Sequence, residues 1–135
     1  MYLTGQFMIV KVQTENAPAA VGPYSQAIKF GSMIFCSGQL PVDPATNKVP
    51  DGIHDQTALC LKNLEAVLQA AHGDLQTVVK TTVFLQDMND FARMNEVYGS
   101  IFGGIGPARS TIEVARLPKD VLIEIDAIAI LGDAQ

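Results

Sequence analysis

The sequence predicts an α+β fold in which a mostly antiparallel sheet carries two helices on one face. Three observations predict it. β-Branched and alternating segments occupy both ends of the chain, two stretches with helical spacing of apolar residues lie between them, and a further β-branched segment separates these stretches. A length of 135 residues fits one domain. We expect that domain over residues 8–135, with residues 1–7 as an N-terminal extension.

The first third of the chain is predicted to contain strands and loops. A short strand over residues 8–13 precedes a segment rich in Pro and Gly, residues 18–23. Residues 26–38 alternate in character and fit two strands joined by a turn at residues 31–32. The stretch 41–52 contains three prolines and is expected to be loop.

The middle of the chain is predicted to form two helices with a strand between them. For the first helix, about residues 55–72, Asp55 is expected to cap the start and Gly73 to end it in the left-handed conformation. Apolar residues at three- and four-residue spacing predict its buried stripe: Leu61, Leu64, Val67, Leu68 and Ala71. Residues 78–86 are β-branched and predict a strand, and a second helix is expected over about residues 89–102.

The last third is predicted to be a β-hairpin of residues 109–116 and 121–130. Alternation in its second strand gives one apolar face: Val121, Ile123, Ile125, Ala127 and Ala129. If residue 116 pairs with residue 121, five polar side chains share the opposite face: Arg109, Thr111, Glu113, Glu124 and Asp126. The sheet face without helices also carries Leu122, Ile128 and Ile130. Because soluble monomers seldom expose such a surface, we expect oligomerisation through the sheet.

Composition excludes several classes of protein. Nine basic and fourteen acidic residues give a net charge of −5, which disfavours nucleic acid as the main partner. Cys36, Cys60, His54 and His72 lack the spacing of a metal site or a disulfide framework. No apolar run reaches the roughly 18 residues of a membrane span, and no signal peptide is recognisable. We therefore expect a cytoplasmic protein in a reduced compartment, without a metal and without a membrane partner.

Arg109 is the first candidate for chemistry. It follows a glycine- and proline-rich approach, residues 103–108, and its planar guanidinium suits two-point recognition of a carboxylate. The alternative, which spacing favours, is a surface arginine paired with Asp126 or Glu113. The glycines of the approach lack the Gly-Lys-Ser/Thr ending of a phosphate loop, so nucleotide binding is rejected.

Glu124 is the second candidate. It lies inside the most apolar segment, residues 121–125, where partial desolvation should raise its pKa and suit it to proton transfer. The alternative is an ion pair with Arg116 or Lys119, and spacing does not separate the two. The two cysteines fit small core residues better than nucleophiles.

Long motifs closely resemble the RidA-type (YjgF-like) family. The strongest is PARSTIEVARLPKDVLIEIDAIA, residues 107–129. Matches extend to residues 14–27, 37–41, 80–84 and 89–92, in the same order along nearly the whole chain. One departure is the stretch before Arg109, which is shorter and richer in glycine than in typical members.

The resemblance implies a chorismate-mutase-like fold and a homotrimer with pockets between its subunits. It also implies hydrolytic deamination of reactive 2-enamino and 2-imino acids, such as 2-aminoacrylate and 2-iminobutanoate, to 2-keto acids and ammonia without a cofactor. The carboxylate-binding arginine of the family matches Arg109, and its water-positioning glutamate matches Glu124. Its pocket positions match Tyr24, Ser37, Gly38 and Asn95. Thr111 stands where many members have a cysteine whose backbone carbonyl is emphasised, so threonine should be tolerated.

Imine hydrolysis fits these residues because an imine is already electrophilic. It needs a carboxylate clamp and a group that places or deprotonates water, and Arg109 and Glu124 supply one of each. Two other functions are considered. RNA cleavage with inhibition of translation, attached to some relatives, is opposed by the acidic charge and the lack of a histidine pair. A non-enzymatic module that binds 2-keto acids would need Arg109 but not Glu124.

Overall fold

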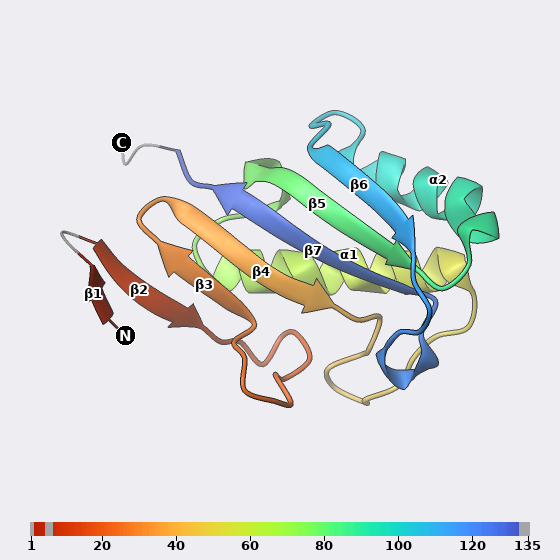
Figure 1. Cartoon of the computed structure of the whole chain (residues 1–135), viewed down its shortest axis with the longest axis horizontal. Coiled ribbons are helices and arrows are strands. Elements are labelled where there is room, and N and C mark those ends of the chain that lie inside the picture. Colours follow the sequence, from red (N-terminus) through yellow and green to blue (C-terminus); the bar gives the residue numbers. More distant parts are fainter. Residues whose placement is uncertain (1, 5–6, 133–135) are drawn as a thin grey trace.

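The computed structural model describes residues 2–4 and 7–132, and of residues 2–4 and 7 only the backbone. The described strands form one sheet in the order β1-β2-β3-β4-β7-β5-β6. Their bounds are β1 (Tyr2–Thr4), β2 (Phe7–Val12), β3 (Ala27–Phe30), β4 (Met33–Gln39), β5 (Val78–Leu85), β6 (Ala108–Glu113) and β7 (Ile123–Ile130). Helices α1 (Ile53–Ala70) and α2 (Phe91–Phe102) lie together on one face of the sheet (Figure 1). The predicted α+β architecture with two helices on one face is confirmed.

The N-terminal strands follow the predicted pattern. β2, β3 and β4 pair antiparallel in sequence order, and the chain turns at Gly31, whose φ of 59° is costly for a residue with a Cβ. β1 pairs antiparallel with β2 and lies within residues 1–7, where no strand is predicted. The stretch 40–52 has neither helix nor strand, as its prolines predict.

Both ends of α1 differ from the prediction. The helix starts after Gly52 (φ 84°) and has no side-chain cap, so the predicted cap at Asp55 is wrong. At the other end His72, not Gly73, is left-handed, with a φ of 70°. The amides of His72 and Gly73 donate to the carbonyls of Gln69 and Leu68, which closes the helix end. A Cβ on Gly73 would lie 2.9 Å from Oγ1 of Thr77 and 3.1 Å from Cδ1 of Ile34, so these side chains would have to shift to accept one.

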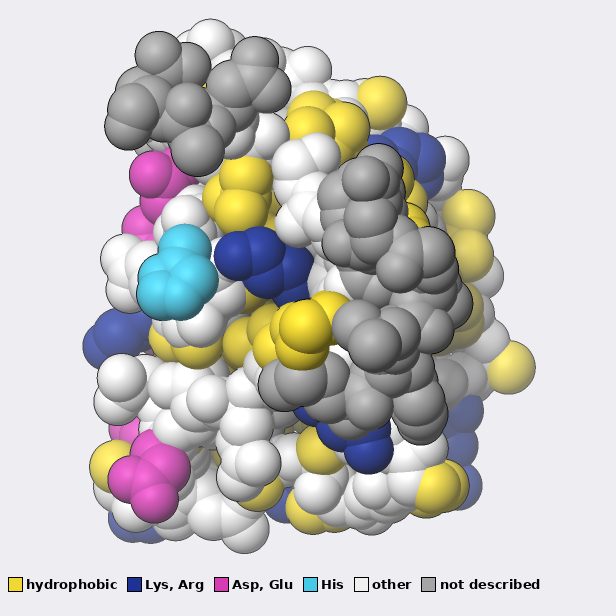
Figure 2. Space-filling model, turned by 90° about the vertical axis from the view of Figure 1, so that its left-hand side faces the viewer, with side chains coloured by type: hydrophobic (Ala, Val, Ile, Leu, Met, Phe, Trp, Pro, Cys, Tyr) yellow, Lys and Arg dark blue, Asp and Glu magenta, His cyan; other side chains and the backbone are white. Residues whose placement is uncertain are grey.

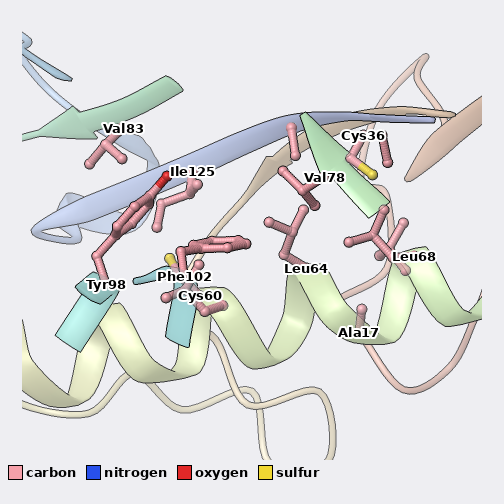
Figure 3. Packing of buried hydrophobic residues seen from close by; sticks show 14 of the residues in the cluster. Ala17, Cys36, Cys60, Leu64, Leu68, Val78, Val83, Tyr98, Phe102 and Ile125 are labelled. Atoms are coloured by element: carbon pink, nitrogen blue, oxygen red, sulfur yellow. The ribbon is translucent and has the colours of Figure 1, made fainter. Parts of the chain in front are cut away.

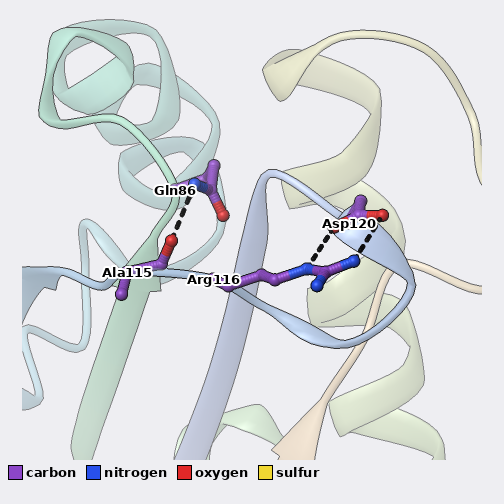
Figure 4. Close-up of polar contacts among 4 residues, drawn as sticks. All are labelled: Gln86, Ala115, Arg116 and Asp120. Atoms are coloured by element: carbon purple, nitrogen blue, oxygen red, sulfur yellow. Dashed lines mark hydrogen bonds and ion pairs between the residues drawn. The ribbon is translucent and has the colours of Figure 1, made fainter.

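The predicted hairpin of residues 109–116 and 121–130 is wrong. β6 pairs parallel with β5, to which α2 connects it, and β7 lies between β4 and β5, antiparallel to both. A helical crossover returns the chain to the starting end of the sheet, so the strand that follows runs parallel. After β6 the chain passes a short turn, Pro118–Asp120, before it crosses to β7. Gln86 donates to the carbonyl of Ala115 at the start of this connection (Figure 4).

The core lies between the helices and the sheet. The predicted stripe of α1 is buried against the apolar face of β7, where Leu64, Leu68 and Ile125 can be followed in Figure 3. Met94 and Phe102 of α2 complete the packing. Both cysteines are buried. Burial, with a smaller effect of the Asp126 charge, raises the pKa of Cys36 to about 12, and burial also raises the pKa of Cys60. Neither thiol therefore has the properties of a nucleophile.

The opposite sheet face has no helix over it. It carries apolar side chains from several strands, of which Phe35, Ile112 and Ile130 are 41%, 44% and 43% exposed. The expected apolar surface on this face is therefore present. In the described part of the chain, no helix is both long and apolar enough to cross a membrane.

Candidate functional site

The predicted site residues fall into two groups in the structure. Asn95, Arg109 and Thr111 lie where α2 meets the edge strand β6, on the helix side of the sheet. The other four, Tyr24, Ser37, Gly38 and Glu124, gather around the end of β4.

Arg109 is held on three sides by α2. Its Nη1 donates to Oδ1 of Asn95 over 2.7 Å, and its guanidinium carbon lies 4.7 Å from the ring centre of Tyr98 and 5.5 Å from that of Phe91. Among the described residues Arg109 has no ion pair. The guanidinium is therefore oriented by neutral groups, and its charge is left available for an anionic ligand.

Tyr98 combines two roles in this arrangement. It is buried, and its hydroxyl shares a 2.7 Å hydrogen bond with Oγ1 of Thr81. Its ring also supports the guanidinium of Arg109. The sequence analysis did not predict that the rings of Tyr98 and Phe91 contact Arg109. The spacing of Phe91, Asn95 and Tyr98, four and three residues, places all three on one face of α2 and is the signal that could have found them.

Thr111 lies on the same face of β6 as Arg109, two residues further along. Its Oγ1 is buried and has no hydrogen-bond partner among the described residues. Buried polar atoms are nearly always paired, so this unpaired hydroxyl near Arg109 is unusual.

Glu124 lies on the face of the sheet that has no helix, directly over Gly38. A Cβ on Gly38 would collide with Oε2 of Glu124 and lie 2.7 Å from its Cδ, so only glycine leaves room for this carboxylate. Burial raises the pKa of Glu124 above its ordinary value of 4.5, and the nearby charge of Asp126 raises it further. The predicted desolvation of Glu124 is confirmed, and a raised pKa makes this carboxylate a stronger base than an exposed glutamate.

A β-bulge brings Gly38 under Glu124. β4 and β7 lose register between Cys36 and Gln39, which adds one residue to β4 at this point. Within the bulge Ser37 donates from its hydroxyl to the carbonyl of Ser25 over 2.6 Å. The contact joins the strand end to the segment that carries Tyr24.

Tyr24 is 52% exposed and lines a hollow of about 320 Å³ together with Gly38. Apolar side chains, among them Val21 and Leu40, form much of the remaining wall. A hollow of this size is large enough for a small organic acid.

The predicted common face of Arg109, Thr111, Glu113, Glu124 and Asp126 is wrong. Arg109 is level with Thr81 of β5 and Glu124 with Phe84, and residues an odd number apart on a strand point to opposite faces. Glu124 and Asp126 thus lie on the open face, and the three residues of β6 on the helix face. The error follows from the wrong strand pairing.

The ionic alternatives considered for the two candidates do not occur in the structure. Glu113 accepts from the amide of Met88, and Asp126 accepts from the amide of Thr82. Arg116 pairs with Asp120 over 2.8 Å (Figure 4), and Lys119 donates to Oδ1 of Asn47. Within residues 2–4 and 7–132 no cluster of three or more His, Cys, Asp or Glu side chains could hold a metal ion.

Known proteins similar to this chain identify its family. The family described as Endoribonuclease L-PSP matches residues 14–131. A RutC family protein of Pyrococcus horikoshii is 59% identical over 117 residues, 86% of this chain and 93% of that protein. A Salmonella typhimurium protein named 2-iminobutanoate/2-iminopropanoate deaminase is 51% identical over 122 residues, 88% of this chain and 95% of that protein.

A solved structure is similar over the same range. The crystal structure of Escherichia coli TdcF with bound serine superposes with a TM-score of 0.88 at 46% identity, and covers 91% of this chain and 99% of the other. The strand order, the two helices and the matched motifs thus agree with a known fold over nearly the whole chain. The chain therefore belongs to the endoribonuclease L-PSP family, the family of the RidA- and YjgF-type proteins that its motifs resemble.

Proposed function

We propose that this protein is a hydrolytic deaminase that converts reactive 2-imino and 2-enamino acids to 2-keto acids and ammonia. The name of the Salmonella relative gives the reaction. Two groups together carry the proposal. The guanidinium of Arg109 is oriented but has no carboxylate partner among the described residues. The carboxylate of Glu124 is desolvated and lies over Gly38.

Each group has one task in the proposed reaction. Arg109 binds the substrate carboxylate through two parallel N–H donors. Ionised Glu124 takes a proton from water as the water oxygen forms a bond to the imine carbon. The protonated Glu124 returns that proton to the nitrogen, which gives a carbinolamine with an OH and an NH2 group. Glu124 then passes the hydroxyl proton to the nitrogen as the C=O bond forms and the C–N bond breaks, and ammonia and the 2-keto acid leave. An enamine such as 2-aminoacrylate enters the reaction after tautomerising to its imine.

The two groups are proposed to act from different subunits of a homotrimer. The backbones of Arg109 and Glu124 are two strand spacings apart, about 10 Å, and three residues apart along the strands, about another 10 Å, and they face opposite sides. In a 2-imino acid the carboxylate and the imine carbon are directly bonded, so one molecule cannot meet both groups within one chain. The apolar open face supplies a surface through which copies can associate.

RNA cleavage is the second candidate, because the matched family carries that name. His54 and His72 flank the ends of α1, which at 1.5 Å per residue is about 27 Å long. Two histidines this far apart cannot act on the same phosphodiester bond within one chain. On the face that Figure 2 shows, basic side chains stand apart, with apolar, acidic and uncharged groups between them, and the net charge is −5. These features favour deamination over RNA cleavage.

The direct test is keto-acid release from freshly generated 2-aminoacrylate. A pyridoxal-phosphate dehydratase supplies the enamine, and pyruvate formation is followed with and without the protein. We expect acceleration over spontaneous hydrolysis with no added metal. Equal rates in the two reactions would refute the deaminase, and binding of pyruvate without turnover would instead support a 2-keto-acid-binding module.

A further inference from the structure

The segment that carries Tyr24 is held by the side chain of one buried residue, Gln26. This side chain is 3% exposed. Its Oε1 accepts from the amide of Thr14 over 2.7 Å, and its Nε2 donates to the carbonyls of Thr14 (3.0 Å), Ala17 (3.4 Å) and Pro18 (2.8 Å). One amide group therefore fastens the start of the loop to its end.

The other end of this loop is tied to the site. The amide of Ser37 donates to the carbonyl of Gln26 over 2.9 Å, and the hydroxyl of Ser37 donates to the carbonyl of Ser25. Gly38, beneath Glu124, is the next residue. Gln26 thus connects two segments. Its backbone carbonyl is hydrogen-bonded to the bulge beneath Glu124, and its side chain is hydrogen-bonded to the loop.

Tyr24 has little else to position it. It is 52% exposed, and its amide makes a tight turn to the carbonyl of Gly22 over 2.8 Å. Tyr24 and Gln26 both line the hollow that contains Gly38, and both line a second hollow of about 590 Å³ formed largely by residues 11–26. The ring therefore stands between two hollows, on a loop whose shape depends on Gln26.

We propose that Gln26 is a positioning residue of the active site, which sets the place of the Tyr24 ring relative to Gly38 and Glu124. This inference rests on the proposed function, because it assumes that Tyr24 contacts the substrate. Gln26 would act only through Tyr24, since its own polar atoms are occupied by the loop backbone. A glutamine fits here because its oxygen accepts from the Thr14 amide while its NH2 group, with two N–H donors, faces the loop carbonyls.

A double-mutant cycle between Gln26 and Tyr24 tests the proposal. Gln26→Met keeps the approximate volume and removes all four hydrogen bonds. We expect kcat/KM for 2-iminopropanoate to fall about tenfold, mainly through KM, in Gln26→Met and in Tyr24→Ala, and by no further factor in the double variant. Effects that multiply, or full activity in Gln26→Met, would overturn the proposal.

Two further measurements separate positioning from general loss of stability. Thr57→Val removes a buried hydrogen bond to Ile53 within α1 and should lower the melting temperature without changing KM. Amide hydrogen exchange in residues 14–25 should accelerate in the Gln26→Met chain and not in the Thr57→Val chain. Unchanged exchange in Gln26→Met would contradict the anchoring.

The Gln26→Glu chain covers the case in which Gln26→Met does not fold. It keeps an acceptor for the Thr14 amide and loses the two N–H donors. Its kcat/KM is measured alone and combined with Tyr24→Ala, and multiplying effects or full activity would again overturn the proposal. An inactive wild-type chain would refute the deaminase itself, whereas an active wild-type chain with multiplying effects would refute only the role of Gln26.

Discussion

Arg109 and Glu124 point to opposite faces of one sheet. Arg109 lies beside α2 and donates a hydrogen bond to Asn95, whereas Glu124 lies over Gly38 on the face that has no helix. Each group is therefore positioned by its own neighbours and can be removed without disturbing the other.

Replacement of Arg109 should abolish detectable imine hydrolysis while the protein stays folded. A charge-assisted contact contributes about 1.5–3 kcal/mol, so Arg109→Ala should lose at least tenfold in kcat/KM. Arg109→Lys should recover little, because an ammonium group cannot form the planar two-point contact. Steady-state kinetics and circular dichroism measure both properties, and normal turnover by folded Arg109→Ala would rule out the clamp.

Glu124→Gln should separate binding from turnover. The amide keeps the shape of the side chain and loses the base, for which a loss of about 100-fold or more in kcat is expected. Calorimetry with pyruvate or 2-oxobutanoate should still detect binding. If binding disappears together with turnover, Glu124 supports the pocket and does not act on water.

Neutralising Asp126 should move the acid limb of the pH–rate profile to lower pH. The pKa of Glu124 is raised by burial and then by the charge of Asp126, and a base loses activity as the pH falls through its pKa. Asp126→Asn removes the second cause and retains Oδ1 as the acceptor for the Thr82 amide. An unchanged limb would mean that another group controls it.

The raised pKa of Glu124 also makes the stability of the fold depend on pH. The folded chain holds the Glu124 proton more tightly than the unfolded chain, so this group's contribution to stability declines as the pH rises above about 4.5 through the folded pKa. Glu124→Gln should therefore have a higher urea midpoint than wild type at pH 7, with the difference shrinking towards pH 4.5. A lower midpoint at pH 7 would contradict the desolvation of Glu124.

Gly38→Ala should reduce kcat at least tenfold, because the added Cβ occupies the position of the Glu124 carboxylate. Gly99→Ala in α2 is the matched control, since a Cβ there meets no atom within 4 Å. It should leave activity unchanged and stabilise the helix by about 0.5–1 kcal/mol. Equal activity of the two variants would mean that Glu124 moves aside without loss of function.

Local patterns were sufficient to predict most strands and helices but not their neighbours. Alternation along residues 123–130 correctly identified the buried side of β7, because one side of a strand faces the core whatever its partner is. The pairing of β7 depends on where α2 returns the chain. A short connection at residues 117–120 is compatible with a hairpin and also with the observed crossing from β6 to β7. The hairpin was predicted, and its pairing placed Arg109 on the same sheet face as Glu124, which is wrong.

The site residues, too, could be predicted from local sequence, but their contacts with neighbouring elements could not. Motif resemblance selected Arg109, Glu124 and Gly38 by position, and the structure adds the reason that Gly38 must be glycine. The stacking of Tyr98 on Arg109 depends on how α2 crosses β6. The spacing within α2 places these residues on one face of the helix, but it does not say which strand that face meets.

Mixed trimers test the proposed division of the site. A pocket at each interface would take Tyr24 and Glu124 from one subunit and Arg109 from the next. Arg109→Ala chains co-assembled with Tyr24→Ala chains, or with Glu124→Gln chains, should then regain activity. Random mixing in a cyclic trimer leaves about a quarter of the interfaces with both groups intact, so activity should recover to roughly that fraction of wild type.

The matched control combines two variants of the same group. In a mixture of Tyr24→Ala and Glu124→Gln chains, every interface lacks one of the two groups, because both belong to the same side of the pocket. This mixture should stay as inactive as its parents, whereas either mixture with Arg109→Ala should recover. Mass spectrometry of the intact assemblies verifies that the subunits have mixed. Recovery in the control, or none with Arg109→Ala in verified mixed trimers, would show that the pocket is divided differently between the chains.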